Sequence, residues 1–389
     1  MAAGHRTRIL IVDDSAVMRS LLRSVISADA ELEVCGTAAD GVSALSSLGV
    51  VRPELILLDV EMPVMDGLAT LRELRKRGHK MPVIMCSSLT QRGAKVTVEA
   101  LASGASDYVA KPSGQSDREA AVRALGLELG PKIRALTPQD VALGPGAPGG
   151  ARPVPGSAVF PGLVRPPPPV PLAPPQRPQA IHANPTALVI GVSTGGPAAL
   201  DVLLPALPSN FPLPVMIVQH MPELFTKLLA ERLDGRCKLR VREAADGDVV
   251  RPGAIFIARG NWHMEIVPAA RGGAPPTLRL NQGPLENHCR PAVDVLFRSA
   301  APTFGSGTLA VILTVMGSDG LVGCRVIREH GGTVLAQDQA SSTVWGMPGA
   351  VTLAGLAHRV LSLHDLAPEI LRLASRTHNE ARELRESVV

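Results

Sequence analysis

Short apolar runs alternate with segments of helical periodicity in two separate stretches of the chain. In the first stretch, five runs of strand length lie at 8–13, 32–38, 54–59, 81–87 and 107–112. The segment after the first run repeats apolar residues at helical spacing, through Val17, Leu21, Leu22, Val25 and Ile26. Such alternation predicts a doubly wound parallel sheet over about residues 7–125.

The same alternation resumes at Ala187 and continues to about residue 375. Strand character is found at 187–192, 254–258 and 332–336, and in two longer runs that end in His220 and Asp319. The pattern from Val293 to Ala300 predicts a helix. We therefore expect a second α/β domain with a Rossmann-like parallel sheet at 186–377, followed by a charged, helix-permissive tail at 378–389.

The chain between the two stretches is rich in proline, glycine and alanine, and we assign residues 126–185 to a linker. Four consecutive prolines stand at 166–169, and almost no periodic apolar pattern is present from Thr137 to Pro185. Proline at this density prevents helices and sheet ladders and favours polyproline II conformations. A semi-rigid spacer is the simpler interpretation, and a ligand for an SH3-type domain is the alternative.

The ends of the first set of strands carry polar side chains that suit a phosphoryl site. These residues are Asp13, Asp14, Asp59, Ser87 and Lys111. Three carboxylates that converge in a small crevice repel one another unless a cation lies among them, and oxygen ligands with room for water favour Mg²⁺. A lysine at the same edge can hold a phosphoryl oxygen. Helix N-caps explain any one of the acids, but they do not explain the lysine and the hydroxyl.

Three strand ends of the second stretch carry the side chains of a serine hydrolase. Ser193 follows an apolar run and precedes two glycines and Pro197, so it enters a tight turn before a helix. In a parallel sheet the carboxyl ends of neighbouring strands share one crevice, so His220 and Asp319 can meet Ser193 there. His220 would take the serine proton, and Asp319 would orient the imidazole. Taken singly, a satisfied histidine and a helix N-cap are the simpler interpretations.

The segment Gly191-Val-Ser193-Thr-Gly195 also fits the nucleophile elbow of α/β-hydrolases. That fold takes its triad in the order serine, acid, histidine. Here the histidine at a strand end precedes the acid, so this rival would have to use His330 or His358, which follow no convincing strand.

Composition narrows the class of protein. Hydrophobic residues make up 46% and aromatic residues only 2%, so aliphatic side chains must fill the cores, as suits an α/β protein. The net charge of +4 comes from dispersed basic residues, which gives nucleic-acid binding little support. Five cysteines without a C-x-x-C pair indicate a reduced, cytoplasmic protein without structural zinc. Because there is neither a signal-type apolar region nor an apolar run near ~18 residues, we expect no secretion or membrane insertion.

The first domain resembles a response-regulator receiver domain of flavodoxin-like fold. The resemblance rests on Asp13-Asp14, on Leu58-Asp59-Val-Glu-Met-Pro63 with Met65-Asp66-Gly67, on Ser87-Ser88, and on Tyr108 before Lys111-Pro112. It implies that Asp59 accepts a phosphoryl group and that Asp13 and Asp14 bind Mg²⁺ with it. It also implies that the backbone carbonyl of Glu61 completes the metal site, that Lys111 contacts the phosphate, and that Ser87 and Tyr108 carry the conformational switch.

The second domain resembles the catalytic domain of the chemotaxis protein-glutamate methylesterase (CheB) family. The motifs are Gly191-Val-Ser-Thr-Gly-Gly196, Val218-Gln-His-Met-Pro222, Arg259-Gly-Asn-Trp-His-Met-Glu265, Arg290-Pro-Ala-Val-Asp-Val-Leu-Phe297, Met316-Gly-Ser-Asp-Gly320 and Gly346-Met-Pro348. The resemblance puts the triad on Ser193, His220 and Asp319, with the backbone N–H of Met316 as oxyanion donor. It implies hydrolysis of glutamate methyl esters on chemoreceptors, deamidation of receptor glutamines, and no cofactor for the esterase.

The partners that the resemblance implies are methyl-accepting chemoreceptors and a histidine kinase of the CheA type. The protein would act as a cytoplasmic monomer, peripheral to receptor arrays. One position departs from the family pattern, because Val315 stands where the family usually has glycine. If that position needs a positive φ, a β-branched valine would be strained there. Valine at this position is also the feature that favours a rival function, a phosphorylation-controlled binding module that has lost catalysis.

Overall fold

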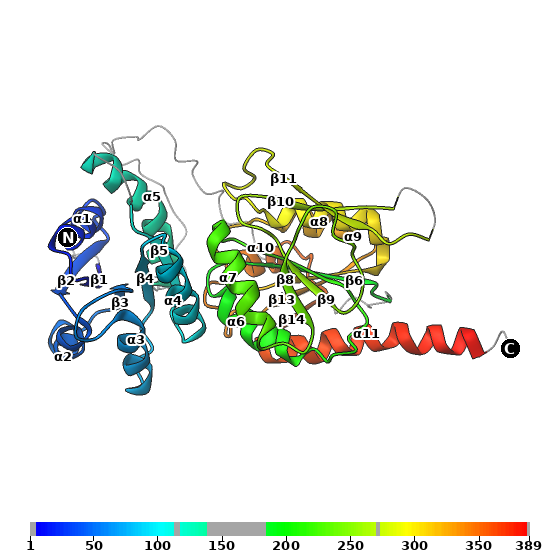
Figure 1. The fold of residues 1–389 in the computed structure, drawn as a ribbon, viewed down its shortest axis with the longest axis horizontal. Helices are drawn as coiled ribbons and strands as arrows, with labels where there is room; N and C mark the ends of the chain where they lie inside the picture. Colours follow the sequence, from blue (N-terminus) through cyan, green and yellow to red (C-terminus); the bar gives the residue numbers. More distant parts are fainter. Residues whose placement is uncertain (1–4, 113–116, 138–183, 270–272, 387–389) are drawn as a thin grey trace, which may run out of the picture.

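The computed structural model describes residues 5–112, 117–137, 184–269 and 273–386, with side chains described up to residue 375 (Figure 1). Two α/β units follow one another along the chain, each built on its own parallel sheet. The fold class expected from the sequence is thereby confirmed. Most of the segment assigned to the linker lies outside the described residues.

The N-terminal unit has a five-stranded parallel sheet in the order β2-β1-β3-β4-β5. Its strands are β1 (Thr7–Val12), β2 (Leu32–Ala38), β3 (Leu55–Asp59), β4 (Val83–Ser87) and β5 (Asp107–Ala110). Its helices are α1 (Ala16–Ser27), α2 (Gly41–Val51), α3 (Gly67–Lys76), α4 (Gln91–Ala102) and α5 (Arg118–Leu136). Each helix has an N-cap residue whose side chain accepts a hydrogen bond from a backbone N–H of the first turn. These N-cap residues are Ser15, Asp40, Asp66, Thr90 and Asp117.

Helix α5 is longer than the sequence pattern indicated. Its residues Leu129, Ile133 and Leu136 are buried in one core cluster with β1 and α1. The expected boundary at residue 125 therefore falls inside this helix, and the N-terminal unit continues to Leu136. The pattern misled because Gly126, Gly130 and Pro131 interrupt the apolar periodicity.

The C-terminal unit has a seven-stranded parallel sheet in the order β14-β13-β12-β6-β7-β9-β8. Its strands are β6 (Ala187–Val192), β7 (Val215–Gln219), β8 (Arg240–Glu243), β9 (Ala254–Ile257), β12 (Thr308–Ile312), β13 (Thr333–Gln337) and β14 (Arg359–Leu361). A separate antiparallel pair is formed by β10 (His263–Val267) and β11 (Thr277–Asn281). The chain first adds β7 and the strands beyond it on one side of β6 and later adds β12 on its other side, so the direction of strand addition reverses beside β6, which is where α/β sheets place ligands.

The helices of this unit cover both faces of its sheet (Figure 1). They are α6 (Gly196–Leu203), α7 (Glu223–Asp234), α8 (Val293–Phe304), α9 (Leu321–Glu329), α10 (Met347–Leu353) and α11 (Leu363–Glu386), with short 3₁₀ turns at η1 (Leu204–Ala206) and η2 (Gly305–Gly307). One core cluster joins α6, α7 and α11 to the sheet, and another joins α8, α9 and α10 to its other side. No helix within the described residues is long and apolar enough to cross a membrane.

The two units are packed together through α4 and β5 of the first and α6 and α7 of the second (Figure 1). The ring of Tyr108 on β5 stacks on Phe225 of α7, with 4.6 Å between ring centroids. Beside it, the hydroxyl of Thr194 donates a hydrogen bond to Asp107 Oδ2 at 2.7 Å. Both contacts are buried, so the units form a specific interface beside Ser193.

Candidate active site and phosphorylation site

The acidic residues expected at the strand ends of the N-terminal unit do meet in one place. Carboxylate oxygens of Asp13, Asp14 and Asp59 all lie within 4.8 Å of one another. The ammonium of Lys111 lies 2.8 Å from Asp13 Oδ2 and 2.7 Å from Asp59 Oδ1. A set of hard oxygen donors with one exposed member, Asp14, fits a hydrated Mg²⁺ better than a soft metal.

Charge is held at this site against the cost of burial. Burial raises the pKa of Asp59, although hydrogen bonding to Lys111 acts in the opposite direction. For Lys111 burial acts to lower the pKa, but its hydrogen bonds to Asp13 and Asp59 outweigh burial and the pKa is raised. Lys111 therefore stays protonated and neutralises part of the acidic cluster.

The remaining residues expected at this site lie around the cluster. Glu61 and Asp14 border a surface cavity of about 390 Å³, and the Glu61 N–H points to Asp59 Oδ1 at 3.4 Å. Ser87 is buried at the end of β4, where its hydroxyl donates to the Ser88 carbonyl. Tyr108 faces the C-terminal unit rather than the cluster. The metal role of the Glu61 carbonyl and the switch roles of Ser87 and Tyr108 stay predictions.

Ser193 is delivered by β6 into a turn held by several hydrogen bonds. Its N–H donates to the Thr314 carbonyl at 3.1 Å, and its own carbonyl accepts from the Gly196 N–H and from Gln219 Nε2. A Cβ at position 196 would lie 2.0 Å from Gln219 Oε1, so only glycine fits there. This close packing explains the glycine at position 196.

His220 is the next residue after β7, which pairs directly with β6. Val192 lies opposite Gln219 in the register, and the His220 N–H donates to the Val192 carbonyl at 3.2 Å. Ser193 and His220 therefore leave adjacent strands side by side. Within the described part of the chain, the Ser193 hydroxyl has no hydrogen-bond partner of its own. Contacts between a nucleophile and its base are often long before substrate binds.

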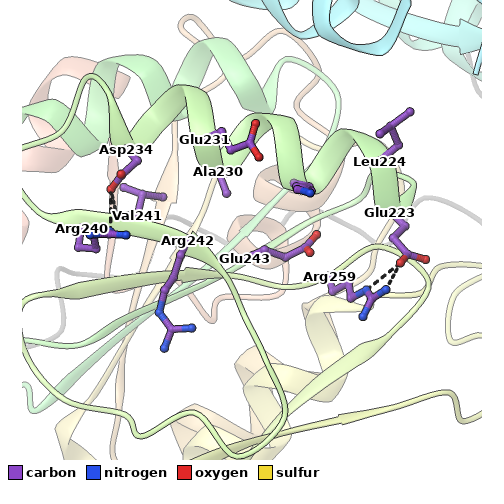
Figure 2. Close-up of a pocket in the computed structure, with 11 residues that line it drawn as sticks. Glu223, Leu224, Ala230, Glu231, Asp234, Arg240, Val241, Arg242, Glu243 and Arg259 are labelled. Atoms are coloured by element: carbon purple, nitrogen blue, oxygen red, sulfur yellow. Dashed lines mark hydrogen bonds and ion pairs between the residues drawn. The ribbon is translucent and has the colours of Figure 1, made fainter. Parts of the chain in front are cut away.

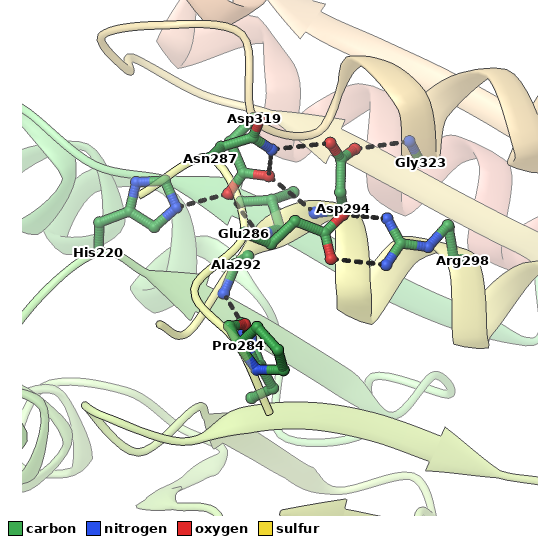
Figure 3. Close-up of polar contacts among 11 residues, drawn as sticks. His220, Pro284, Glu286, Asn287, Ala292, Asp294, Arg298, Asp319 and Gly323 are labelled. Carbon is green, nitrogen blue, oxygen red and sulfur yellow. Dashed lines mark hydrogen bonds and ion pairs between the residues drawn. The ribbon is translucent and has the colours of Figure 1, made fainter. Parts of the chain in front are cut away.

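Asp319 contacts His220 directly, with 2.8 Å between Asp319 Oδ2 and His220 Nε2 (Figure 3). The expected apolar run that ends in Asp319 is shorter as a strand, since β12 stops at Ile312 and a loop carries the chain on to α9. Asp319 is 3% exposed, and its carboxylate accepts the first N–H groups of α8, from Val293 at 2.7 Å and Asp294 at 3.0 Å. The N-terminus of a helix favours a negative charge.

These contacts polarise the pair. Burial alone would lower the pKa of His220, but the hydrogen bond to Asp319 and the nearby side chain of Cys289 raise the pKa to about 9. Burial acts to raise the pKa of Asp319, and the hydrogen bond from His220 outweighs it, so the pKa is lowered. Asp319 is therefore ionised, and it favours a positive charge on the imidazole.

The loop between β12 and α9 also carries Met316. Within the described residues its backbone N–H has no hydrogen-bond partner, whereas the neighbouring Val315 N–H donates to the Val344 carbonyl. Met316 thus offers a free backbone donor on the loop that also carries Asp319. The oxyanion role stays a prediction.

The strain considered for Val315 is not present. Val315 does not adopt a positive φ, whereas Gly317 does, at 91°. The valine is 0% exposed, forms a parallel bridge with Trp345 and accepts hydrogen bonds from Gly346 and Met347. Extended backbone inside a core suits a β-branched side chain. Valine therefore fits this position, which removes the feature that favoured a non-catalytic binding module.

Several polar residues of the site were not given a role by the sequence pattern. Asn287 donates to the carboxylates of both Asp319 and Asp294 (Figure 3), and Cys289 lies close to His220. Thr314 fixes the turn of Ser193 by donating its hydroxyl proton to the Thr194 carbonyl. Asp294 lies inside the motif from Arg290 to Phe297, and that motif was the available signal. The other residues lie on loops where spacing carries no information.

A cavity of about 820 Å³ lies elsewhere on the catalytic unit (Figure 2). It is bordered by α7 and β8 and lined by both signs of charge. Its charged side chains are largely paired, as in Arg259 with Glu223 and Arg240 with Asp234. None of Ser193, His220 or Asp319 borders this cavity.

Comparison with known proteins places both units in families. Residues 9–123 match the model of the response regulator receiver domain, and residues 188–370 match that of the CheB methylesterase. The chain is 48% identical to the protein-glutamate methylesterase/protein-glutamine glutaminase of Nocardioides sp. over 95% of its length and 96% of that protein. It is 45% identical to the protein of the same name from Trichodesmium erythraeum over 94% of this chain and 98% of that protein.

A solved structure, the CheB methylesterase catalytic domain of Thermotoga maritima, is 43% identical with a TM-score of 0.47, and the match covers 49% of this chain and 98% of that one. The two curated relatives match along nearly their whole length, across the receiver and the catalytic unit alike. The chain therefore belongs to the family of protein-glutamate methylesterases/protein-glutamine glutaminases, enzymes in which a receiver domain precedes a CheB methylesterase domain.

Proposed function

We propose that this protein hydrolyses glutamate methyl esters on methyl-accepting chemoreceptors and that phosphorylation of Asp59 activates it. Deamidation of receptor glutamines to glutamate is the related reaction at the same site. The observation that carries the proposal is the buried contact of 2.8 Å between His220 and Asp319, with Ser193 on the adjacent strand end. The names of the curated relatives agree with both activities.

The geometry assigns a role to each nitrogen of the histidine. Because Nε2 is engaged by Asp319, Nδ1 is the nitrogen left to take the proton of Ser193. The serine oxygen then bonds to the side-chain carbonyl carbon of the substrate, and the Met316 N–H stabilises the negative oxygen that forms. Proton return from His220 releases methanol, or ammonia from a glutamine. Water, activated by the same histidine, cleaves the acyl-serine to glutamate.

Asp319 supplies the electrostatic part of this sequence. Its negative charge is held by the helix α8 amides, so it stabilises the imidazolium that forms in each step. The charge does not have to be created during the reaction, since the pKa of Asp319 is already lowered. No step needs a metal at this site.

Control by the receiver domain is supported by the interface beside the nucleophile. Thr194, the residue after Ser193, is tied to Asp107 of the receiver, and Met316 packs against the receiver core. Substrate access to Ser193 therefore competes with docking. We propose that docking blocks the crevice and that the phosphorylated receiver releases it.

The switch begins at the acidic cluster, where a bound Mg²⁺ would balance the charge of the incoming phosphoryl group. Asp13, Asp14 and Asp59 would hold the ion, and Lys111 would hold a phosphoryl oxygen. Tyr108 is two residues from the end of β5 and adjoins Asp107, so a shift of β5 at these two residues would change both contacts with the catalytic unit. A CheA-type histidine kinase is the phosphodonor that fits this receiver, and the protein would work as a cytoplasmic monomer at receptor arrays.

Methanol release from methylated receptor, measured with and without a small phosphodonor, tests the function. His220→Ala should lower turnover by about 10⁴-fold or more, whereas Asp319→Asn should leave a measurable remainder. Unchanged release by His220→Ala at unchanged folding would rule out this histidine as the base.

A further inference from the structure

The loop before α8 contains a tight turn with an unusual backbone. Glu286 and Cys289 exchange both backbone hydrogen bonds, at 3.1 and 2.8 Å, and enclose only two residues. Those residues, Asn287 and His288, have φ values of 51° and 62°. Two consecutive left-handed residues define a type I′ turn, which favours asparagine at its first central position. Such a conformation costs free energy for any residue other than glycine, so a compensating interaction is expected.

The compensating interaction is made by the Asn287 side chain. Its Nδ2 donates to Asp319 Oδ1 at 2.9 Å and to Asp294 Oδ2 at 3.1 Å (Figure 3). A primary amide has two N–H donors, and here each serves a different carboxylate. Asp319 is 3% exposed and Asp294 is 2% exposed, so water screens the repulsion between their negative charges only weakly. Asn287 is the group that bridges them.

The turn is held in place from both sides. Arg298 of α8 forms an ion pair with Glu286, with 2.7 Å between Nη2 and Oε2. On the other side, Arg290 donates to Asn261 Oδ1 at 2.7 Å and to the Gly283 carbonyl at 2.8 Å. Anchors at both ends mean that the amide is presented at a fixed position rather than by a mobile loop.

Asp294, one of the two carboxylates that the Asn287 amide contacts, is itself held in place by helix α9. Its other oxygen, Oδ1, accepts the Gly323 N–H of α9 at 2.6 Å, so this carboxylate connects α8 to α9. Asp294 itself follows Val293, and both N–H groups hold Asp319. The amide of Asn287 thus links the catalytic aspartate to the frame of two helices.

We propose that Asn287 is a positioning residue of the esterase site, which fixes the orientation of the Asp319 carboxylate toward His220 and separates it from Asp294. This inference rests on the proposed function, in which Asp319 stabilises the imidazolium. Asn287 acts through Asp319 and does not touch the substrate's reacting atoms. Its loss therefore lowers kcat and leaves KM nearly unchanged.

Substitution by glycine tests the contribution of the side chain separately from that of the turn's backbone. Asn287→Gly keeps the left-handed backbone and removes the amide, whereas His288→Gly makes the same change one residue later, at a side chain outside the bridge. We expect Asn287→Gly to lower kcat by about 10- to 100-fold, the effect of losing a hydrogen bond to a charged group. His288→Gly should stay within about twofold of the parent kcat.

Substitution by aspartate gives a second test, the pH dependence of kcat. A purely structural role of Asn287 in the turn would not change this dependence. Asn287→Asp is nearly isosteric, and while its carboxyl is protonated it can still donate one hydrogen bond. Once ionised, it adds a third negative charge beside Asp319 and Asp294. The ratio of variant to parent kcat should therefore fall as the pH rises, and Asn287→Gly should show a ratio independent of pH.

The experiment measures kcat and KM for methanol release from methylated receptor by full-length chains, with circular dichroism as the check on folding. Equal kcat for Asn287→Gly and His288→Gly, or a pH-independent ratio for Asn287→Asp, would overturn the inference. If Asn287→Gly does not fold, the pH-dependence of Asn287→Asp decides alone. A comparison of the parent with Ser193→Ala separates the role of Asn287 from the proposed function. Methanol release that does not depend on Ser193 would refute the proposed function, whatever the Asn287 variants show.

Discussion

Replacement of Val315 by glycine tests whether the loop of the oxyanion donor depends on packing or on backbone freedom. The valine is 0% exposed and bridges to Trp345, directly before Met316. Losing a buried valine side chain costs about 1.5–3 kcal/mol, and glycine in an extended segment costs roughly a further 0.5–1 kcal/mol. We therefore expect Val315→Gly to lower the stability of the catalytic unit by about 2–4 kcal/mol.

The matched control is Val64→Gly, the same substitution at a site where valine is strained. Val64 is 86% exposed and has a φ of 66°, so it buries little and occupies the left-handed region. Relief of that conformation is worth roughly 1–2 kcal/mol, against about 0.5–1 kcal/mol for the extra entropy of glycine in the unfolded chain. Val64→Gly should therefore leave the receiver equally stable or slightly more stable.

Thermal unfolding measures both effects, in the receiver by circular dichroism and in the catalytic unit by tryptophan fluorescence. The two tryptophans, Trp262 and Trp345, both lie in the catalytic unit, so their fluorescence reports its transition. A loss of about 2–4 kcal/mol corresponds to a lower Tm by roughly 4–16 °C for a unit of this size. Methanol release should fall as well, because the Met316 amide loses its support. A Val315→Gly chain with parental Tm and higher activity would refute the packing argument and restore the strained-valine interpretation.

Three further predictions concern charge and control. Because a general base acts only when neutral and the pKa of His220 is raised to about 9, methanol release should rise about tenfold from pH 7 to pH 8 and about fivefold more from pH 8 to pH 9, and a midpoint near the ordinary histidine pKa would contradict this. Asp107→Ala removes the acceptor of the Thr194 hydroxyl and should raise the activity of the unphosphorylated full chain; unchanged activity would show that this contact does not hold the closed form. Asp59→Asn should stay at the basal rate whatever phosphodonor is added, and activation of this variant by acetyl phosphate would move the phosphorylation site elsewhere.

The sheets were predictable because their strands are buried on both faces. Apolar runs such as 54–59 and 187–192 are continuous, and in parallel sheets their ends must share one edge, which is why Asp59 and Lys111 were expected together and are found 2.7 Å apart. The short edge strands β8 and β14 were not predicted, since Arg240 and Arg359 at their starts face solvent and break the apolar pattern.

Two features that the hydrophobic pattern did not predict, the end of β12 and the role of Asn287, depend on tertiary contacts. The loop that carries Asp319 has apolar residues like a strand, yet it leaves the sheet after Ile312 because Val315 pairs with Trp345 instead. Asn287 was not assigned a role because its effect depends on two left-handed residues and on carboxylates from two other segments. No spacing within the chain encodes such a contact.

We propose Ser193 as the nucleophile, and methanol release by the full-length Ser193→Ala chain is the decisive measurement of that role. The assay compares this variant with the parent on one methylated receptor preparation, with phosphodonor present and folding checked by the Tm. We expect a rate lower by about 10⁴-fold or more, with an unchanged Tm because the hydroxyl has no partner in the described residues. Release at near the parental rate would contradict it.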